Sequence, residues 1–229
     1  MIASLSRHEY KYVISHKSAE LLKQQLNALL RLDCHAGVDG SYFVRSVYFD
    51  DATLSSFRDK LNGAKCRNKY RLRCYKMNME RFSFEAKRKY DRLIMKDSTV
   101  VTRQLAEVML SGGRLNQAER HDALLAEFHA LAALGCMQPC VIVDYDRIAY
   151  TYEPDNIRIT LDYDVRAEAY RFQNVFEQRA SIPVLENNEV VLEIKYGEHL
   201  PAFIAGALAG VPKLLCAHSK YCNCLDVYQ

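Results

Sequence analysis

The chain has 229 residues, and a hydrophobic fraction of 49% allows a sizeable globular core. Its 31 basic and 28 acidic residues leave a formal net charge of only +3. This balance excludes a nucleic-acid-binding assignment from bulk charge alone, so any anionic partner must be argued from local arrangement. No apolar run reaches membrane-span length, so the sequence predicts no membrane span of its own.

The N-terminal residues 1–7 contain no apolar signal-peptide core, which favours a cytoplasmic protein with reduced cysteines. Two of the cysteine spacings are short, Cys136–Cys140 and Cys222–Cys224. Neither spacing matches the CxxC-like ligand pairs of zinc sites. We expect these cysteines to act as small buried apolar residues, with zinc ligation as the alternative.

Several elements are predicted in the first part of the chain. Residues 7–14 alternate between charged and aromatic side chains, which is typical of a strand. Leucines at helical spacing predict an amphipathic helix over 19–32. A loop rich in Gly and Asp then leads to a strand over 42–49, and a short helix is expected over 53–60.

A basic β-hairpin is predicted next, with strands over 65–76 and 81–89 and a turn over 78–80. Because side chains alternate along a strand, the first strand places its basic residues on one face and Tyr70, Leu72 and Cys74 on the other. The second strand places Phe82, Phe84 and Ala86 opposite its charged residues. A further short strand is predicted over 93–95.

The remaining elements follow from the same signals. Helices are predicted over 102–110, 117–134, 201–210 and 217–227, and strands over 140–150 and 157–163. A hairpin is expected from 184–185 and 190–196 around a turn, and 164–179 receives no assignment. Together these elements predict one α+β domain over residues 1–229, an antiparallel β-barrel with helices packed outside.

The charged faces of the predicted strands share a basic bias. Their members are Glu9, Lys11, Arg71, Arg73, Glu85, Lys87, Lys89, Arg147, Arg158, Glu193 and Lys195, and Lys220 of the last helix can join them. A barrel that turns these faces inward would enclose a positive tunnel. So many like charges favour a bound polyanion, since Arg and Lys both bind phosphate oxygens. The carboxylates would hold a divalent cation that bridges the phosphates. For each single strand, the alternative is a charged face solvated by water.

Eight short motifs carry a family resemblance. They are Arg7-His8-Glu9-Tyr10-Lys11-Tyr12, Ser46-Val47-Tyr48-Phe49-Asp50, Arg71-Leu72-Arg73, Phe84-Glu85-Ala86-Lys87, Tyr145-Asp146-Arg147, Arg158-Ile159-Thr160-Leu161-Asp162, Leu192-Glu193-Ile194-Lys195 and Ser219-Lys220-Tyr221. In this order they resemble the VTC domain, the polyphosphate polymerase branch of the triphosphate tunnel metalloenzymes, which are related to CYTH proteins. The resemblance covers nearly the whole chain.

The resemblance implies a tunnel that binds ATP and inorganic polyphosphate and transfers the γ-phosphate of ATP to the growing chain, assisted by Mn²⁺ or Mg²⁺. By motif, the catalytic phosphate-binding residues would be Lys11, Arg71, Arg73, Lys87, Arg147, Arg158, Lys195 and Lys220. Of these, Lys11, Arg71, Arg73, Lys87 and Arg158 would bind the nucleotide together with Lys89, which stands where the eukaryotic enzymes place a histidine. Glu193 would hold the metal, with Glu9 and Glu85 as further metal ligands.

One departure bears on the reaction. Triphosphatases of the wider superfamily begin with Glu-x-Glu-x-Lys, whereas this chain has Arg7-x-Glu9-x-Lys11. The substitution disfavours a two-metal hydrolase and favours a polyphosphate-handling tunnel. A CYTH-type phosphohydrolase, or triphosphatase, and a non-catalytic polyphosphate- or nucleotide-binding module are the alternatives. The expected partners are ATP and polyphosphate, no nucleic acid, and a possible separate membrane protein that receives the polymer.

Overall fold

The computed structural model describes residues 8–91, 93–177, 181–186, 188–216 and 218–229. The chain divides into two compact units. Unit 1 comprises Met1–Phe43, Tyr145–Arg166 and Pro183–Ser219, and unit 2 comprises Val44–Asp144, Ala167–Ile182 and Lys220–Gln229. Three strands run from one unit into the other, namely β3 (Ser41–Asp50), β7 (Gln138–Tyr152) and β8 (Ile157–Ala169). The single domain predicted over 1–229 stays a prediction.

Unit 1 is built on a sheet with the strand order β11-β1-β10-β8-β7. Its own strands are β1 (His8–Ser15), β10 (Glu189–Tyr196) and β11 (Leu214–Leu215), and β2 (Arg31–Leu32) pairs with β7. The pairings of β1 with β10 and of β10 with β8 are antiparallel. They fix which charged side chains stand opposite one another.

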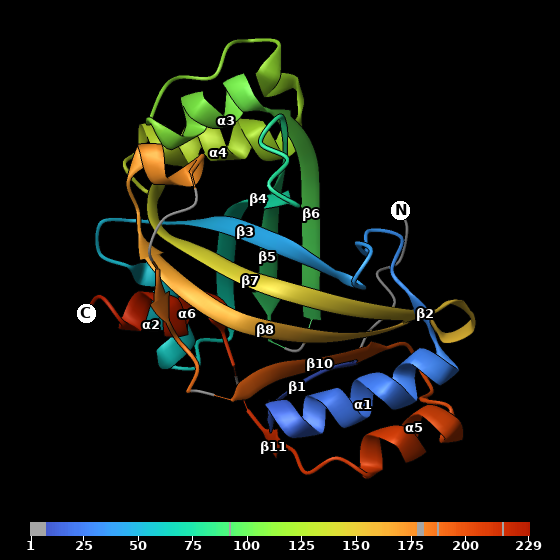
Figure 1. The fold of residues 1–229 in the computed structure, drawn as a ribbon. Coiled ribbons are helices and arrows are strands. Elements are labelled where there is room, and N and C mark those ends of the chain that lie inside the picture. Colours follow the sequence, from blue (N-terminus) through green and yellow to red (C-terminus); the bar gives the residue numbers. More distant parts are fainter. Residues whose placement is uncertain (1–7, 92, 178–180, 187, 217) are drawn as a thin grey trace. The chain divides into compact units, whose positions relative to one another are not determined.

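Two helices, α1 (His16–Leu29) and α5 (Ala202–Ala209), cover the apolar face of unit 1 and lie side by side beneath β10 in Figure 1. Leu22 and Leu26 of α1 belong to one buried cluster with Ile204 of α5, and strand residues such as Ile159 and Leu192 complete it. The Ser15 side chain accepts a hydrogen bond from the Ser18 amide and caps α1. Because strand residues alternate, burial of Ile159 and Leu192 turns Thr160 and Glu193 to the opposite face.

Unit 2 has the strand order β7-β3-β4-β5-β6, with β4 (Cys66–Tyr75), β5 (Arg81–Tyr90) and β6 (Leu93–Thr102). Its helices are α2 (Ser55–Leu61), α3 (Arg103–Leu110), α4 (Ala123–Ala133) and α6 (Lys220–Asp226), and α3 and α4 lie against each other in Figure 1. The core joins Leu72 and Phe84 of the sheet to Met109 of α3 and Phe128 of α4. The basic residues of the β4–β5 hairpin therefore lie on the face that α3 and α4 leave uncovered.

Most predicted elements are present, but several predictions are wrong in extent or pairing. The helix predicted over 117–134 begins only at Ala123, and the strand predicted over 157–163 continues to Ala169. The helix predicted over 19–32 begins earlier and ends at Leu29, and β6 is a strand of 10 residues instead of three. The segment 184–185 forms no hairpin with β10, because β10 pairs with β1 and β8. Three short 3₁₀ helices and a two-residue strand complete the described elements: η1 (Glu119–His121), η2 (Glu153–Asp155), η3 (Phe172–Val175) and β9 (Ile182–Pro183).

The α+β class and the antiparallel sheet are confirmed. The predicted barrel is not established, because hydrogen bonds between described strands do not join the ends of the strand order. None of the described helices is both long enough and apolar enough to cross a membrane.

Asp51 stabilises the turn that leads into α2. Its Oδ1 accepts hydrogen bonds from the amides of Thr53 and Ser55 and from the Thr53 hydroxyl. These hydrogen bonds, to Ser55 and Thr53, outweigh the effect of burial and lower the pKa of Asp51 to about 2.

We expect Asp51→Ala to lower the free energy of unfolding by about 1 kcal/mol at neutral pH. Since the folded-state pKa is depressed, the stabilisation is present above the unfolded pKa of about 3.9 and is lost as pH falls towards 2. Urea unfolding of Asp51→Ala and the parent chain between pH 7 and pH 2 tests this. A difference that does not shrink in acid would contradict it.

Candidate anion-binding site

Unit 1 carries a charged sheet face, which we call the Glu193 face: Glu9, Lys11, Arg147, Arg158, Thr160, Asp162, Glu193 and Lys195. The register places its members of β1, β10 and β8 in rows across the sheet. One row is Glu9, Lys195 and Arg158, and the next is Lys11, Glu193 and Thr160. Directly opposed side chains in such rows are close enough to interact. Opposite charges therefore face each other at Glu9 and Lys195 and at Lys11 and Glu193, whereas Lys195 and Arg158 are like charges on neighbouring strands.

Glu193 is the centre of this arrangement. Its Oε1 lies 3.5 Å from Nζ of Lys11 and 3.2 Å from Nζ of Lys195. Lys11 also lies 3.2 Å from Oε1 of Glu9. Burial by itself would raise the pKa of Glu193, but Lys11, Lys195 and Arg147 outweigh it and hold that pKa well below its usual value. Glu193 is thus an anion at all physiological pH values.

Arg147 is fixed by a bidentate ion pair. Its Nε and NH2 donate to the two carboxylate oxygens of Asp162 at 2.6 and 2.8 Å. Its guanidinium carbon lies 5.0 Å from the centre of the Tyr145 ring. Two parallel charge-assisted bonds and a stacked ring hold the guanidinium in one orientation.

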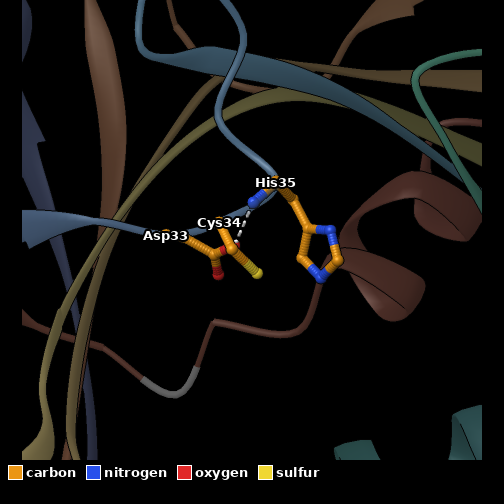
Figure 2. A group of neighbouring side chains, drawn as sticks. All are labelled: Asp33, Cys34 and His35. Atoms are coloured by element: carbon orange, nitrogen blue, oxygen red, sulfur yellow. Dashed lines mark hydrogen bonds between the residues drawn. The ribbon is translucent and has the colours of Figure 1, made fainter.

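Arg158 is held by residues that approach from outside β8. Its NH1 lies 2.5 Å from Oδ2 of Asp33, and its NH2 donates to the Tyr42 hydroxyl at 3.0 Å. Figure 2 shows Asp33 beside Cys34 and His35, with Oδ1 of Asp33 accepting the His35 amide at 2.7 Å. Both oxygens of this buried carboxylate therefore have partners.

The side chains of Asp33, Cys34 and His35 could in principle hold a metal, since their ligand atoms lie within 4.8 Å of one another. An ion there would have to displace Arg158 from Asp33, so we assign none. Within the described ranges this is the one such group, and it contains neither predicted cysteine pair. Cys222 and Cys224 are buried as expected, whereas Cys136 is exposed and Cys140 is partly buried.

Unit 2 carries a second charged face, which we call the Glu85 face: Ser46, Tyr48, Arg67, Lys69, Arg71, Arg73, Ser83, Glu85, Lys87, Lys89 and Lys96. Glu85 lies at its centre. Its Oε2 is 2.6 Å from NH2 of Arg71 and 4.0 Å from NH1 of Arg73, and its Oε1 is 3.0 Å from Nζ of Lys96. Burial would raise the pKa of Glu85, but these cations prevail and hold it far below its usual value.

Hydroxyl groups orient the two arginines of this face. The Tyr48 hydroxyl accepts a hydrogen bond from NH1 of Arg71 at 2.9 Å, and the Ser46 hydroxyl accepts one from Nε of Arg73 at 3.0 Å. Burial would raise the pKa of Tyr48, but Arg71 and Arg73 lower it. Both guanidinium groups are thus fixed by one carboxylate and by side chains of β3.

A row of like charges crosses the same face. Lys69 of β4 stands directly opposite Lys87 of β5, and Lys87 stands opposite Lys96 of β6. Arg67 likewise stands opposite Lys89. Like charges placed directly opposite one another in a sheet destabilise it. An anion bound over this row would relieve the repulsion.

Helix α6 lies beside this row through the residues that follow Lys220. The Tyr221 hydroxyl donates to Oδ2 of Asp50 at 2.5 Å, and Nζ of Lys69 lies 5.1 Å from the Tyr221 ring centre. Asp50 also accepts the amides of Ser56 and Phe57 at the start of α2. These contacts place the N-terminus of α6, where Lys220 lies, near the basic face of unit 2.

The family model of the VTC domain matches residues 6–228. The chain belongs to the VTC domain family. No curated protein matches it. Solved structures similar to this VTC domain include a putative adenylate cyclase from Bacillus halodurans, with a TM-score of 0.48, 15% identity and coverage of 90% of this chain and 89% of that chain. The PH1012 protein of Pyrococcus horikoshii has a TM-score of 0.43 and 12% identity, with coverage of 89% of this chain and 86% of that chain. A chain of the Schizosaccharomyces pombe Mediator head module has a TM-score of 0.48 and 11% identity, with coverage of 89% of this chain and 90% of that chain.

The structure divides the predicted site residues of this VTC domain between its two units. Unit 1 brings together Glu9, Lys11, Arg147, Arg158, Glu193 and Lys195. Unit 2 brings together Arg71, Arg73, Glu85, Lys87 and Lys89, with Lys220 on α6. Their roles as phosphate, nucleotide and metal ligands stay predictions. Arg7, on which the distinction from triphosphatases rests, lies outside the described residues.

Sequence reasoning missed several partners of these residues. Lys96 was not predicted to lie on a charged strand face, because its strand was predicted to end at residue 95. Asp162 and Tyr48 stood in quoted motifs, and their position on the charged face was the available signal. Asp33 lies in a loop, where nothing local pointed to its pairing with Arg158.

Proposed function

We propose that this VTC domain is a metal-dependent polyphosphate polymerase that transfers the γ-phosphate of ATP to a growing inorganic polyphosphate chain. The observation that carries the proposal is the Lys69–Lys87–Lys96 row beside Arg71 and Arg73 on the Glu85 face. A polyanion with regularly spaced charges suits such a row better than a single carboxylate does, because several cations can contact successive phosphates.

The resting ion pairs support a ligand that carries its own charge. Lys11 and Lys195 form ion pairs with Glu193. Arg158 forms one with Asp33, and Arg71 forms one with Glu85. Each carboxylate acts as a counter-ion that keeps a basic side chain in place while no phosphate is bound. Phosphate oxygens compete for the same donors, so binding requires little rearrangement of the backbone.

The donor set of unit 1 fits Mn²⁺ or Mg²⁺. Glu193 and Glu9 offer carboxylate oxygens, and the hydroxyl of Thr160 lies opposite Glu193. Hard divalent cations of this kind prefer oxygen ligands and keep several water molecules. Glu193 would hold the ion with Glu9 once Lys11 and Lys195 move to phosphate oxygens. Glu85 would likewise have to release its arginine and lysine partners. A bound metal would supply positive charge that neutralises the negative charge developing on the phosphates during transfer.

The protein's own contribution is alignment and charge neutralisation. Phosphoryl transfer needs little covalent help, and its rate depends on positioning the phosphates and on stabilising their equatorial oxygens. Arg71, Arg73 and Arg147 are suited to this because their guanidinium groups are already oriented by fixed partners. We also propose that the ligand is enclosed by the basic tunnel expected from the sequence, although strand pairing alone does not close it.

The test is incubation of the purified protein with ATP and Mn²⁺, followed by separation of the products on a polyacrylamide gel stained for polyphosphate. A ladder of long polymer is the expected result. Release of phosphate and ADP without polymer would show that the protein is a triphosphatase and not a polymerase. Tight polyphosphate binding without ATP consumption would show that the protein is a non-catalytic binding module.

Replacing Lys87 should stabilise the ligand-free protein and weaken its binding of polyphosphate. We expect Lys87→Met to raise the melting temperature of the ligand-free protein in low salt, by roughly 1–3 °C, because it removes the repulsion from Lys69 and Lys96. The gain should shrink as NaCl is added, since salt screens exposed charges. Polyphosphate affinity should fall in the same variant.

The measurements are thermal unfolding across a salt series and titration with polyphosphate of defined length. Lys65→Met, an exposed lysine outside the row, serves as the control. A Lys87→Met protein that melts lower than its parent and binds polyphosphate equally well would argue against an anion site on this face.

A further inference from the structure

Thr160 is a polar residue buried on the Glu193 face. Its side chain lies in the middle of β8 and is 2% exposed. Among the described residues, Oγ1 has no hydrogen-bond partner. Buried hydroxyls in folded proteins nearly always have one, so an orphaned hydroxyl points to a water molecule or ion that belongs there.

The neighbours of Thr160 identify the kind of ligand. In the register Thr160 stands opposite Glu193, and Arg158 and Asp162 flank it on the same face of β8. Arg158 is turned to Asp33, and Asp162 accepts from Arg147. Glu193 is therefore the one adjacent acidic group on β10 that a cation could share with this hydroxyl.

Glu193 does not satisfy the hydroxyl itself. Both of its lysine contacts are made at Oε1, to Lys11 and to Lys195, and no hydrogen bond joins the carboxylate to Oγ1 of Thr160. A hydroxyl this close to a carboxylate normally donates to it. Because the two residues are directly opposed on neighbouring strands, one bound group could contact both side chains.

We propose that Thr160 is a positioning residue for the hydrated divalent cation of the proposed polymerase. Its hydroxyl accepts a hydrogen bond from a water molecule coordinated to an Mn²⁺ or Mg²⁺ ion that Glu193 holds. This inference rests on the proposed function, because it presumes a cation at Glu193. Such outer-sphere partners orient the coordinated water and typically change metal affinity 10- to 100-fold when removed.

Valine is the decisive replacement. Thr160→Val keeps the branched shape and removes only the hydroxyl, so the packing of β8 should be preserved. If Oγ1 serves a bound ligand, the metal-free variant should be at least as stable as its parent, since an orphaned polar atom leaves the interior. It should lose cation affinity at the same time. Thr160→Ser retains the hydroxyl and should retain affinity.

The experiment measures Mn²⁺ binding without turnover. Purified protein is titrated with Mn²⁺, alone and with inorganic tripolyphosphate, and the free ion is followed by its electron paramagnetic resonance signal. Thr160→Val should bind Mn²⁺ about tenfold more weakly, while Thr160→Ser stays within about twofold of the parent. Thr151→Val, a half-buried threonine on β7, is the matched control and should leave affinity unchanged.

Three results would overturn the inference: equal affinity in Thr160→Val and its parent, equal losses in Thr160→Val and Thr160→Ser, or no Mn²⁺ binding by the parent even with tripolyphosphate. Circular dichroism and thermal unfolding of the metal-free variants establish that each is folded. Because no ATP is present, Thr160-dependent Mn²⁺ binding would stand even if the gel assay showed no polymer. Conversely, polymer synthesis by a Thr160→Val protein with normal affinity would refute the inference and leave the proposed function intact.

Discussion

Glu193→Gln is expected to lower the rate of polyphosphate synthesis from ATP by at least about a hundredfold. The replacement keeps the size of the side chain and removes the charge that both Lys11 and Lys195 contact. That charge is present throughout the neutral range, since burial is outweighed by these lysines and Arg147 and the pKa of Glu193 is held well below its usual value. A neutral amide is a weaker ligand for a divalent cation, because its oxygen carries no negative charge.

The same substitution should separate metal binding from phosphate binding. With Glu193 neutral, Lys11 and Lys195 lose a shared counter-ion, so affinity for tripolyphosphate in the absence of metal should stay equal or increase. Affinity for Mn²⁺ should decrease. A misfolded variant would not lose affinity for Mn²⁺ while its affinity for tripolyphosphate stayed equal or increased.

Initial rates are read from the polyphosphate ladder, and binding is measured by titration with tripolyphosphate and with Mn²⁺. Glu189→Gln, on the same strand, is the control and should synthesise polymer at the parental rate. A Glu193→Gln protein that makes polymer within about tenfold of the parental rate would remove Glu193 from the metal site, because losses of single charged contacts in such reactions are larger.

Arg45→Met is expected to destabilise the protein by about 3–5 kcal/mol. Arg45 is 1% exposed and lies on the apolar face of β3, opposite Cys74. Its Nε and NH2 donate to the two oxygens of Asp144 at 2.9 and 2.7 Å. Its NH1 donates to the carbonyl oxygens of Asn174, Val175 and Glu177. Removal of the guanidinium leaves a buried carboxylate and several carbonyl groups without a donor.

In a chain of this length, such a loss lowers the melting temperature by on the order of 10 °C. The double variant Arg45→Met/Asp144→Leu should recover part of it, since the unpaired buried charge is then absent. Full recovery is not expected, because the carbonyl oxygens near η3 still lack their donor.

Urea unfolding of the two single variants, the double variant and the parent gives the coupling energy of the pair. Lys23→Met is the control, since Lys23 forms a partly exposed ion pair with Glu20 at 3.5 Å, which should contribute less than about 1 kcal/mol. Additive effects of Arg45→Met and Asp144→Leu would show that the ion pair does not stabilise unit 2.

The sequence alone determined which residues share a strand face, because alternation is a local property of the extended chain. It therefore predicted the basic β4–β5 hairpin, the shared face of Glu193 and Lys195, and the opposite burial of Leu192 and Ile194. The eight motifs in order also indicated the VTC family, which the match over residues 6–228 confirms. Composition and periodicity correctly predicted the α+β class.

Only the tertiary structure decided which groups meet. Pairing between distant strands and loops is set by long-range packing, and no local pattern specifies it. That packing creates three ion pairs that the sequence did not predict: Asp33 with Arg158, Lys96 with Glu85, and Asp144 with Arg45. It also buries Thr160 opposite Glu193, with no hydrogen-bond partner for its hydroxyl among the described residues. The sequence gives no sign of this, because threonine is an ordinary strand residue. The sequence thus determined the charges available, and the tertiary fold determined which of them pair with one another.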